Sequence, residues 1–247
     1  MLIKRGTPSS IYRWLRQKQL RMKHILLPLR RVRDFGELGR LTPISRDFGF
    51  DRGTPIDRYY IEHFLSSHAS DIQGCVAEFQ DDRYTRRFGA GRVIRSEVIN
   101  HAKDNPLATI VTDIAGGTGI PSSTFDCIIC TQVLLFVYDF RSAIQTLYRI
   151  LKPGGVLLVT VPGIGHKADR TDAGLAGDYW RFTTVSMRAL FQEVFPPEKV
   201  QIESFGNVFA AVALLHGLAV EELEASALDH CDSEFEVSIV IRSIKPE

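Results

Sequence analysis

Two short motifs in the sequence have residue types and spacings that could do chemistry. The first is the C-x-x-C pair Cys127 and Cys130, the spacing of redox and zinc-binding motifs. Both cysteines lie in the apolar run 125–130, which indicates a buried strand. Because residues three apart on a strand point to opposite faces, the two thiols would not act together. We therefore expect buried structural thiols and predict no metal site.

The second motif is the glycine run 113–119, D-I-A-G-G-T-G, which has the composition of a nucleotide-binding loop. Such a loop must lead from a strand into a helix, so that backbone N–H groups converge on the ligand. Here the glycines lead through Pro121 directly into the next predicted strand at Phe125. The sequence therefore predicts a flexible connection between two strands.

The elements that would position a site alternate between strands and helices from about residue 72. The predicted strands lie near 75–79, 92–95, 109–114, 125–131, 155–161, 199–205 and 235–243. The predicted helices lie near 55–65, 82–88, 140–151, 184–195 and 208–226. Apolar strands that alternate with helices are typical of a mostly parallel sheet covered on both faces. Ligands of such sheets bind beyond the carboxyl ends of the strands, where the strand order reverses.

The charge of the chain is divided unevenly. The 247 residues carry a formal net charge of +1 and are 45% apolar, which excludes a disordered or fibrous protein. Residues 1–40 hold a net charge of +9 and the remainder −8. Residues 10–27 have the pattern of an amphipathic basic helix. This arm would either pack on the body or contact an anionic surface, such as lipid or nucleic acid.

The longest uninterrupted apolar run, 208–215, is too short to span a bilayer. We therefore expect a cytoplasmic protein, with a peripheral position at the membrane surface as an alternative that depends on the basic arm. The acidic body gives no reason to expect a nucleic-acid substrate. The oligomeric state is left open.

The segment 125–162 resembles the second half of class I S-adenosylmethionine-dependent methyltransferases, in which an F-D-x-I strand is followed by a helix and an L-K-P-G-G turn. Residues 71–79, 84–89, 108–113 and 177–183 are similar to a bacterial methyltransferase-type family often encoded beside glycosyltransferases, and 51–60 to its pre-domain signature. The resemblance implies a Rossmann-like α/β fold with a seven-stranded, mostly parallel sheet, helices on both faces and an N-terminal helical extension. It suggests a basic arm and connector at 1–47, a cap segment at 48–70 and a methyltransferase-like domain at 71–247.

The resemblance also implies S-adenosyl-L-methionine as cofactor and gives roles to strand-end residues. Glu78 corresponds to an acid that orients the cofactor's amino-acid end, and Glu97, just after the second strand, to the acid that accepts both ribose hydroxyls. Asp113 corresponds to the partner of the adenine amino group, with Ile114 beside the ring. The residues expected to face the methionine moiety are Thr131 and Gln132. Alternatively, Glu78 and Asp113 are solvated acids at strand ends and Glu97 is an acid at a helix start.

Two positions depart from the family pattern. Gln80 stands where members have a glycine in the turn after the first strand, so its side chain would either intrude on the cofactor or supply a replacing hydrogen bond. Leu135 stands where related sequences carry His or Glu, and leucine cannot shuttle a proton. These departures motivate an alternative: a methyltransferase-fold protein that has lost methyl transfer and acts as a binding partner, or catalyses another reaction, in glycan or natural-product assembly.

Methyl transfer to oxygen needs alignment of the reacting atoms and gains from a general base. The segment after the fifth strand offers two candidate bases, His166 and Asp178. The residues expected to contact a small-molecule or glycan acceptor are Tyr59, Tyr179, Trp180 and Arg181. Trp180 would otherwise pack in the core, and Asp139 is either an N-cap or a further base. The predicted reaction is O-methylation of a sugar or secondary-metabolite hydroxyl.

Overall fold

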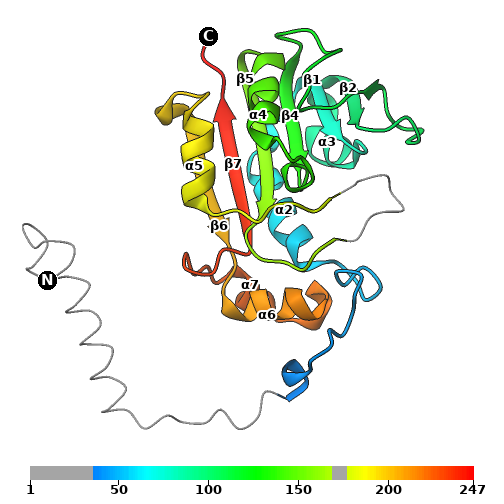
Figure 1. Ribbon diagram of the computed structural model, residues 1–247, viewed down its shortest axis with the longest axis vertical. Helices are drawn as coiled ribbons and strands as arrows, with labels where there is room; N and C mark the ends of the chain where they lie inside the picture. Colours follow the sequence, from blue (N-terminus) through cyan, green and yellow to red (C-terminus); the bar gives the residue numbers. More distant parts are fainter. Residues whose placement is uncertain (1–35, 169–176) are drawn as a thin grey trace, which may run out of the picture. The chain divides into compact units, whose positions relative to one another are not determined.

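A seven-stranded sheet with the order β3-β2-β1-β4-β5-β7-β6 organises the chain (Figure 1). The computed structural model describes residues 36–168 and 177–247. The strands are β1 (Gly74–Phe79), β2 (Val93–Asn100), β3 (Ile110–Val111), β4 (Phe125–Thr131), β5 (Leu151–Pro162), β6 (Val200–Phe205) and β7 (Ser238–Ile244). Strands β1 to β5 pair in parallel, and β7 runs antiparallel to both β5 and β6. The predicted seven-stranded, mostly parallel sheet is confirmed.

The chain divides into two compact units, Met1–Leu41 and Thr42–Glu247, and the sheet belongs to the second. In the first unit, the described part contains the short 3-10 helix η1 (Gly36–Gly39). The amphipathic helix predicted at 10–27, and with it the N-terminal helical extension, lies outside the described residues.

The helices of the second unit are α2 (Ile56–Ser67), α3 (Arg83–Gly89), α4 (Phe140–Ile150), α5 (Thr184–Gln192), α6 (Val208–His216) and α7 (Ala225–Asp229). Short 3-10 helices connect them: η2 (Ala69–Asp71), η3 (Ala90–Arg92), η4 (Leu134–Phe136), η6 (Pro197–Lys199) and η7 (Val220–Glu222). The prediction of one long helix at 208–226 is wrong. Helix α6 ends at Gly217, whose φ of +70° makes it a left-handed cap that donates its N–H to the carbonyls of Ala213 and Leu214.

The two faces of the sheet pack against different helices. Helices α4 and α5 cover one face, together with η4, whereas α2 and α3 cover the other. Cys130 points into the first of these cores and Cys127 into the second, and both side chains are fully buried. Burial raises the pKa of both thiols. The prediction of two structural cysteines on opposite faces is confirmed.

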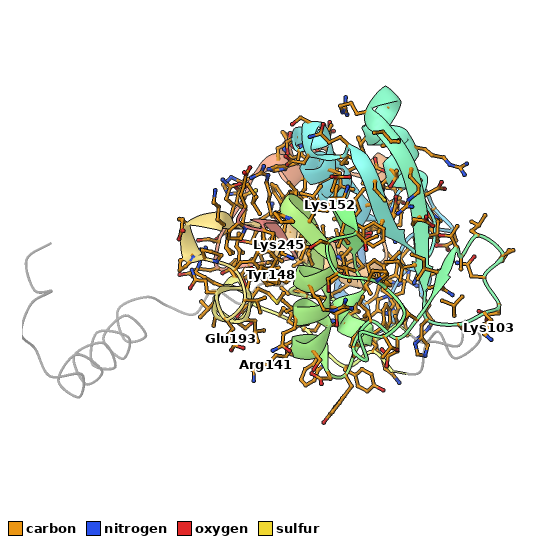
Figure 2. The ribbon with its side chains drawn as sticks, turned by 90° about the horizontal axis from the view of Figure 1, so that it is seen from above. Lys103, Arg141, Tyr148, Lys152, Glu193 and Lys245 are labelled. Carbon is orange, nitrogen blue, oxygen red and sulfur yellow. The ribbon has the colours of Figure 1, made fainter. Side chains whose placement is uncertain are left out.

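Helix α4 is fixed at both ends. At its start, the Asp139 carboxylate accepts a hydrogen bond from the Ser142 N–H at 3.1 Å, so this residue is the N-cap and the alternative of a base is not supported. At its end, the Lys245 ammonium lies 4.8 Å from the centre of the Tyr148 ring and donates to the Leu151 carbonyl at 2.7 Å. Figure 2 labels both side chains, which lie close to each other. These contacts hold α4 at both of its ends.

Residues 42–55 are fastened along the segment from α6 to η7, which lies beside α7 in Figure 1. The N–H groups of Ile44 and Ser45 donate to the His216 carbonyl at 2.9 and 3.0 Å. The Thr54 N–H and hydroxyl donate to the Glu221 carboxylate at 2.8 and 2.7 Å. These hydrogen bonds hold residues 42–55 in place, so that the start of α2 lies at the carboxyl edge of the sheet. Across 36–168 and 177–247, no helix combines the length and the apolar character that crossing a bilayer requires.

Candidate functional site

Two adjoining cavities open at the carboxyl ends of the parallel strands, on either side of the β1–β4 pair where the strand order reverses. The β2–β3 cavity encloses about 1170 Å³ including its open mouth, and the β4–β5 cavity about 780 Å³. Gln80 and Phe136 line both, so they form the boundary between the two. Without the open solvent at their mouths, the β2–β3 cavity has a volume of about 410 Å³, enough for part of a small organic ligand, and the β4–β5 cavity about 100 Å³, enough for a small group.

The β2–β3 cavity contains two of the predicted cofactor residues. Asp113 follows β3 and accepts a hydrogen bond from the Ala115 N–H at 2.9 Å through Oδ1, which fixes the carboxylate at the cavity wall. Ile114 is buried and, with Ile99 of β2, gives the cavity an apolar wall. Tyr179 also lines it and lies edge to face with Tyr138, with 5.3 Å between ring centres. This combination of apolar walls and a carboxylate suits a flat heterocycle that bears an amino group.

Glu97 lies away from both cavities, in contrast to its predicted role. Strand β2 is longer than predicted because it pairs with β1 along the whole length of that strand, so Glu97 lies within β2 opposite Ala77. Its carboxylate is 3.3 Å from the Arg95 Nε, on the same face of the strand. The residues at the carboxyl end of β2 that line the cavity are Asn100 and His101.

Glu78 is 2% exposed and serves the fold directly. One carboxylate oxygen accepts from the Tyr84 N–H at 3.1 Å, and the other accepts from the Thr85 N–H at 2.7 Å and the Thr85 hydroxyl at 2.8 Å. These N–H groups belong to the first turn of α3, where unpaired amides favour a negative charge. Burial raises the pKa of Glu78 to about 7, although the hydrogen bonds from Thr85 and Tyr84 oppose that rise. Glu78 thus anchors the β1–α3 turn and lines neither cavity; the alternative of a solvated acid is wrong.

Gln80 has the backbone conformation of a glycine, the residue that the family pattern has at this position. Its φ of +71° lies in the left-handed region, which favours glycine and costs other residues about 1 kcal/mol. The strained conformation is held by two hydrogen bonds: its N–H donates to the Ile99 carbonyl at 3.0 Å, and its carbonyl accepts from the Asn105 side chain at 2.6 Å. The turn has therefore kept the geometry of a glycine while placing a side chain at the boundary of the cavities.

The β4–β5 cavity begins at the end of β4, where Thr131 and Gln132 line it as predicted. The Gln132 N–H donates to the Thr160 carbonyl of β5 at 2.9 Å, which holds the residue at the sheet edge. Leu135, carried by η4, presents an apolar side chain to the same cavity. Any base must therefore come from another segment.

His166 lines this cavity and is arranged as a proton acceptor. Its ring stacks on Phe48 with 3.8 Å between ring centres, and its Nδ1 lies 3.0 Å from the Lys167 carbonyl. Because a carbonyl only accepts, Nδ1 carries the proton, and in the neutral ring Nε2 is then an acceptor. Nε2 is buried and has no hydrogen-bond partner among the described residues.

Asp178 and Arg181 line the same cavity but are occupied with each other. Two guanidinium nitrogens of Arg181 donate to the two carboxylate oxygens of Asp178 at 2.5 and 2.8 Å, and the Ala168 N–H donates at 2.7 Å. Burial alone would raise the pKa of Asp178, but these hydrogen bonds lower it. A carboxylate held in this way is a weak base, so His166 is the better of the two candidates. Arg181 also donates to the His166 carbonyl at 2.6 Å, which positions that residue.

Two predicted acceptor residues do not line either cavity. The Tyr59 hydroxyl donates to the Asp229 carboxylate at 2.5 Å, which ties α2 to α7. The Trp180 indole N–H donates to the Val137 carbonyl at 3.1 Å, and its ring packs against Phe140 with 5.1 Å between ring centres. The core-packing alternative for Trp180 therefore holds.

Sequence reasoning missed the residue next to Tyr59. Neighbours on a helix point about 100° apart, so Arg58 faces the β4–β5 cavity while Tyr59 faces away from it. Both residues belong to the motif at 51–60, and the apolar periodicity of α2, in which Tyr60, Ile61 and Phe64 are buried, would have separated the two directions. Phe48 and Phe50 also line the cavity and carried no comparable signal.

Comparison with known proteins places this geometry in context. A family model described as a methyltransferase domain matches residues 92–159, from the start of β2 to near the end of β5. No curated protein matches the sequence. A SAM-dependent methyltransferase from Archaeoglobus fulgidus has a similar structure, with a TM-score of 0.51 and 10% identity over 76% of this chain and 94% of that one. The Rossmann-like class I methyltransferase fold is therefore confirmed.

Two further structures show weaker similarity. One is a putative S-adenosylmethionine-dependent methyltransferase from Listeria monocytogenes, with a TM-score of 0.49 and 11% identity over 78% of this chain and 99% of that one. The other is phosphoethanolamine N-methyltransferase 2 from Haemonchus contortus, with a TM-score of 0.49 and 14% identity over 76% of this chain. This chain spans 53% of the length of the Haemonchus protein.

Proposed function

We propose that this protein is an S-adenosylmethionine-dependent methyltransferase that acts on a hydroxyl group of a small-molecule or glycan acceptor. The observation that carries the proposal is the pair of adjoining cavities at the carboxyl edge of the sheet. One has apolar walls and a carboxylate, and the other has a buried imidazole nitrogen that no described residue pairs with. The methyltransferase-domain match at 92–159 supports the reaction type. Glycan or natural-product biosynthesis is part of the same proposal.

The residues of the β2–β3 cavity fit the adenosine half of S-adenosylmethionine. Ile99 and Ile114 would flank the adenine ring, and the Asp113 carboxylate would accept from its amino group. Asn100 lines the cavity at the end of β2 and would contact the ribose in the role predicted for Glu97. The methionine half would then pass Gln80 toward Thr131 and Gln132.

The β4–β5 cavity would hold the acceptor hydroxyl beside His166. The cofactor supplies an activated methyl group on a sulfonium, so the protein's task is alignment and removal of one proton. His166 Nε2 would take the hydroxyl proton as the oxygen attacks the methyl carbon, and the proton would leave on the imidazolium. The wall formed by Leu135 and Phe136 would exclude water from the reacting atoms.

Calorimetry with S-adenosylhomocysteine tests the proposed cofactor. We expect micromolar binding by the wild type and at least a tenfold loss in Asp113→Ala, because a buried ligand N–H group would lose its acceptor. Asp104→Ala, which changes an exposed acid outside both cavities, is the matched control and should bind normally. No heat with the wild type would count against the cofactor assignment and favour a protein that has lost methyl transfer.

Gln80→Gly separates a functional cofactor site from a degenerate one. We expect the variant to gain about 1 kcal/mol in free energy of unfolding, because glycine relieves the φ of +71°, and to bind S-adenosylhomocysteine several-fold more tightly, because the side chain leaves the cavity boundary. Chemical denaturation and calorimetry measure the two effects.

Ser123→Gly is the matched control for this change. Ser123 also has a positive φ, of 54°, but it is exposed in the turn before β4 and lines neither cavity. It should gain similar stability without any gain in affinity. If Gln80→Gly weakens binding instead, the glutamine amide is a cofactor contact rather than an obstruction.

A further inference from the structure

Arg58 is a charged residue of the β4–β5 cavity that the proposed mechanism does not use. It lies in the first turn of α2, where its Nη1 donates to the Tyr84 hydroxyl at 3.1 Å. Its guanidinium carbon lies 6.0 Å from the centre of the Phe50 ring. The Nε atom is buried without a hydrogen-bond partner in the part of the chain that the structure describes. The side chain is therefore held in place while part of its donor fork stays unused.

The position of Arg58 relates it to the β1–α3 turn. Its hydrogen-bond partner, Tyr84, belongs to the first turn of the α3 helix. Gln80, in the connection between β1 and α3, lines the cavity together with Arg58. Burial would raise the pKa of Asp81 in this turn, but Arg83 and, to a smaller extent, the charge of Arg58 lower it. Arg58 thus stands next to the turn in which a glycine-rich loop would be expected and is absent.

Among the described residues that line this cavity, Arg58 is the guanidinium without a bidentate carboxylate partner, although Asp57 lines the cavity beside it. Arg181, the other guanidinium in the lining, is already paired in bidentate fashion with Asp178. Arg58 forms no ion pair with a described residue, although Asp57 is close enough to raise its pKa against the effect of burial. A buried guanidinium is costly unless an anion compensates it, and its planar fork matches a carboxylate.

We propose that Arg58 binds the terminal carboxylate of the cofactor and so replaces, with a side chain, the backbone contacts of the missing glycine-rich turn. This inference rests on the proposed function. A cofactor whose adenosine half fills the β2–β3 cavity passes Gln80 into the β4–β5 cavity, and Gln80 and Arg58 line that second cavity together. The cap segment would then contribute to cofactor affinity as well as to the acceptor pocket.

Two ligands that differ in the amino-acid end test this inference. S-adenosylhomocysteine carries the carboxylate, whereas 5′-methylthioadenosine lacks the whole amino-acid moiety. By calorimetry, Arg58→Gln should bind S-adenosylhomocysteine about 10- to 100-fold more weakly and 5′-methylthioadenosine within twofold of the wild type. Arg58→Lys keeps the charge but lacks the planar fork of donors. Its affinity for S-adenosylhomocysteine should lie between those of the wild type and Arg58→Gln, and its affinity for 5′-methylthioadenosine should match the wild type.

Two more variants keep the test decisive. Arg87→Gln changes an exposed arginine on α3 that pairs with Glu62, and it should leave both affinities unchanged. Tyr84→Phe removes the hydrogen bond that orients Arg58 and should weaken S-adenosylhomocysteine binding several-fold. This variant supplies the test if Arg58→Gln does not fold. Equal losses for both ligands, or no loss for S-adenosylhomocysteine, would overturn the carboxylate assignment. Binding of neither ligand by the wild type would instead overturn the proposed function.

Discussion

His166→Gln should lower the kcat of methyl transfer at least 100-fold, the usual contribution of a positioned general base. Glutamine has a similar size and can keep contact with Phe48, but its amide cannot take a proton from a hydroxyl. Transfer of a labelled methyl group to a panel of hydroxylated sugars and aromatic alcohols measures the rate. Affinity for S-adenosylhomocysteine should change less than threefold, because the proposed role of His166 lies on the acceptor side.

Two comparisons show whether the loss is chemical. His230→Gln changes an exposed histidine outside both cavities and should transfer methyl groups at the wild-type rate. In His166→Ala, added imidazole should restore part of the activity, because it can occupy the vacated space and accept the proton. A His166→Gln rate within threefold of the wild type, or a loss that imidazole does not reverse, would remove His166 from the role of base.

The free energy of unfolding should fall by on the order of 3 kcal/mol as the pH rises from about 4.5 to about 7, through Glu78 alone. Its pKa is about 7 in the folded chain and 4.5 when unfolded. Between these values the folded state holds a proton that the unfolded state has released, so raising the pH favours unfolding. This contribution is complete below pH 4.5 and is lost as the pH passes 7.

Urea unfolding of the wild type and Glu78→Gln at pH 5 and pH 7.5 measures this contribution. All other titrating groups are common to the two proteins, so the difference between them isolates Glu78. Glutamine does not titrate, although one of the three hydrogen bonds to α3 is lost with it. The wild type should lose more stability than the variant between the two pH values. Equal losses would mean that the α3 amides hold Glu78 ionised throughout.

Local signals in the sequence predicted the elements that depend mainly on neighbouring residues. The unit from β4 through α4 to β5 is an example, because its start at Phe125 and the Asp139 cap follow local rules. The K-P-G-G motif was predicted to end the helix, but α4 ends at an extended Leu151 and the motif lies within β5. The end of β2 could not be placed in this way. Strand β2 is longer than predicted because it pairs with β1, which no local signal shows. As a result, Asn100 rather than Glu97 stands at the carboxyl end of β2 and lines the cavity.

The roles of individual site residues depended on tertiary partners in the same manner. His166 and Asp178 are equivalent candidates by residue type, and the ion pair with Arg181 is what separates them. The break at Gly217 was missed because α6 is apolar around its whole circumference, so periodicity does not mark its end. The Ser45 carbonyl lies 2.5 Å from where a Cβ on Gly217 would stand, a constraint that arises only when residues 42–55 pack along α6 in the folded chain.

The attachment of residues 42–55 along α6 and η7 bears on how such a protein can diversify. Part of the wall of the β4–β5 cavity comes from Phe48 and Phe50 ahead of the sheet and from Leu214 and Val237 after β5, whereas the family match covers only 92–159. Substitutions in these flanking walls leave the strand pairing of β1 to β5 untouched. Under the proposed function, the acceptor side of the site can therefore change by substitution without altering the strands that carry the cofactor side.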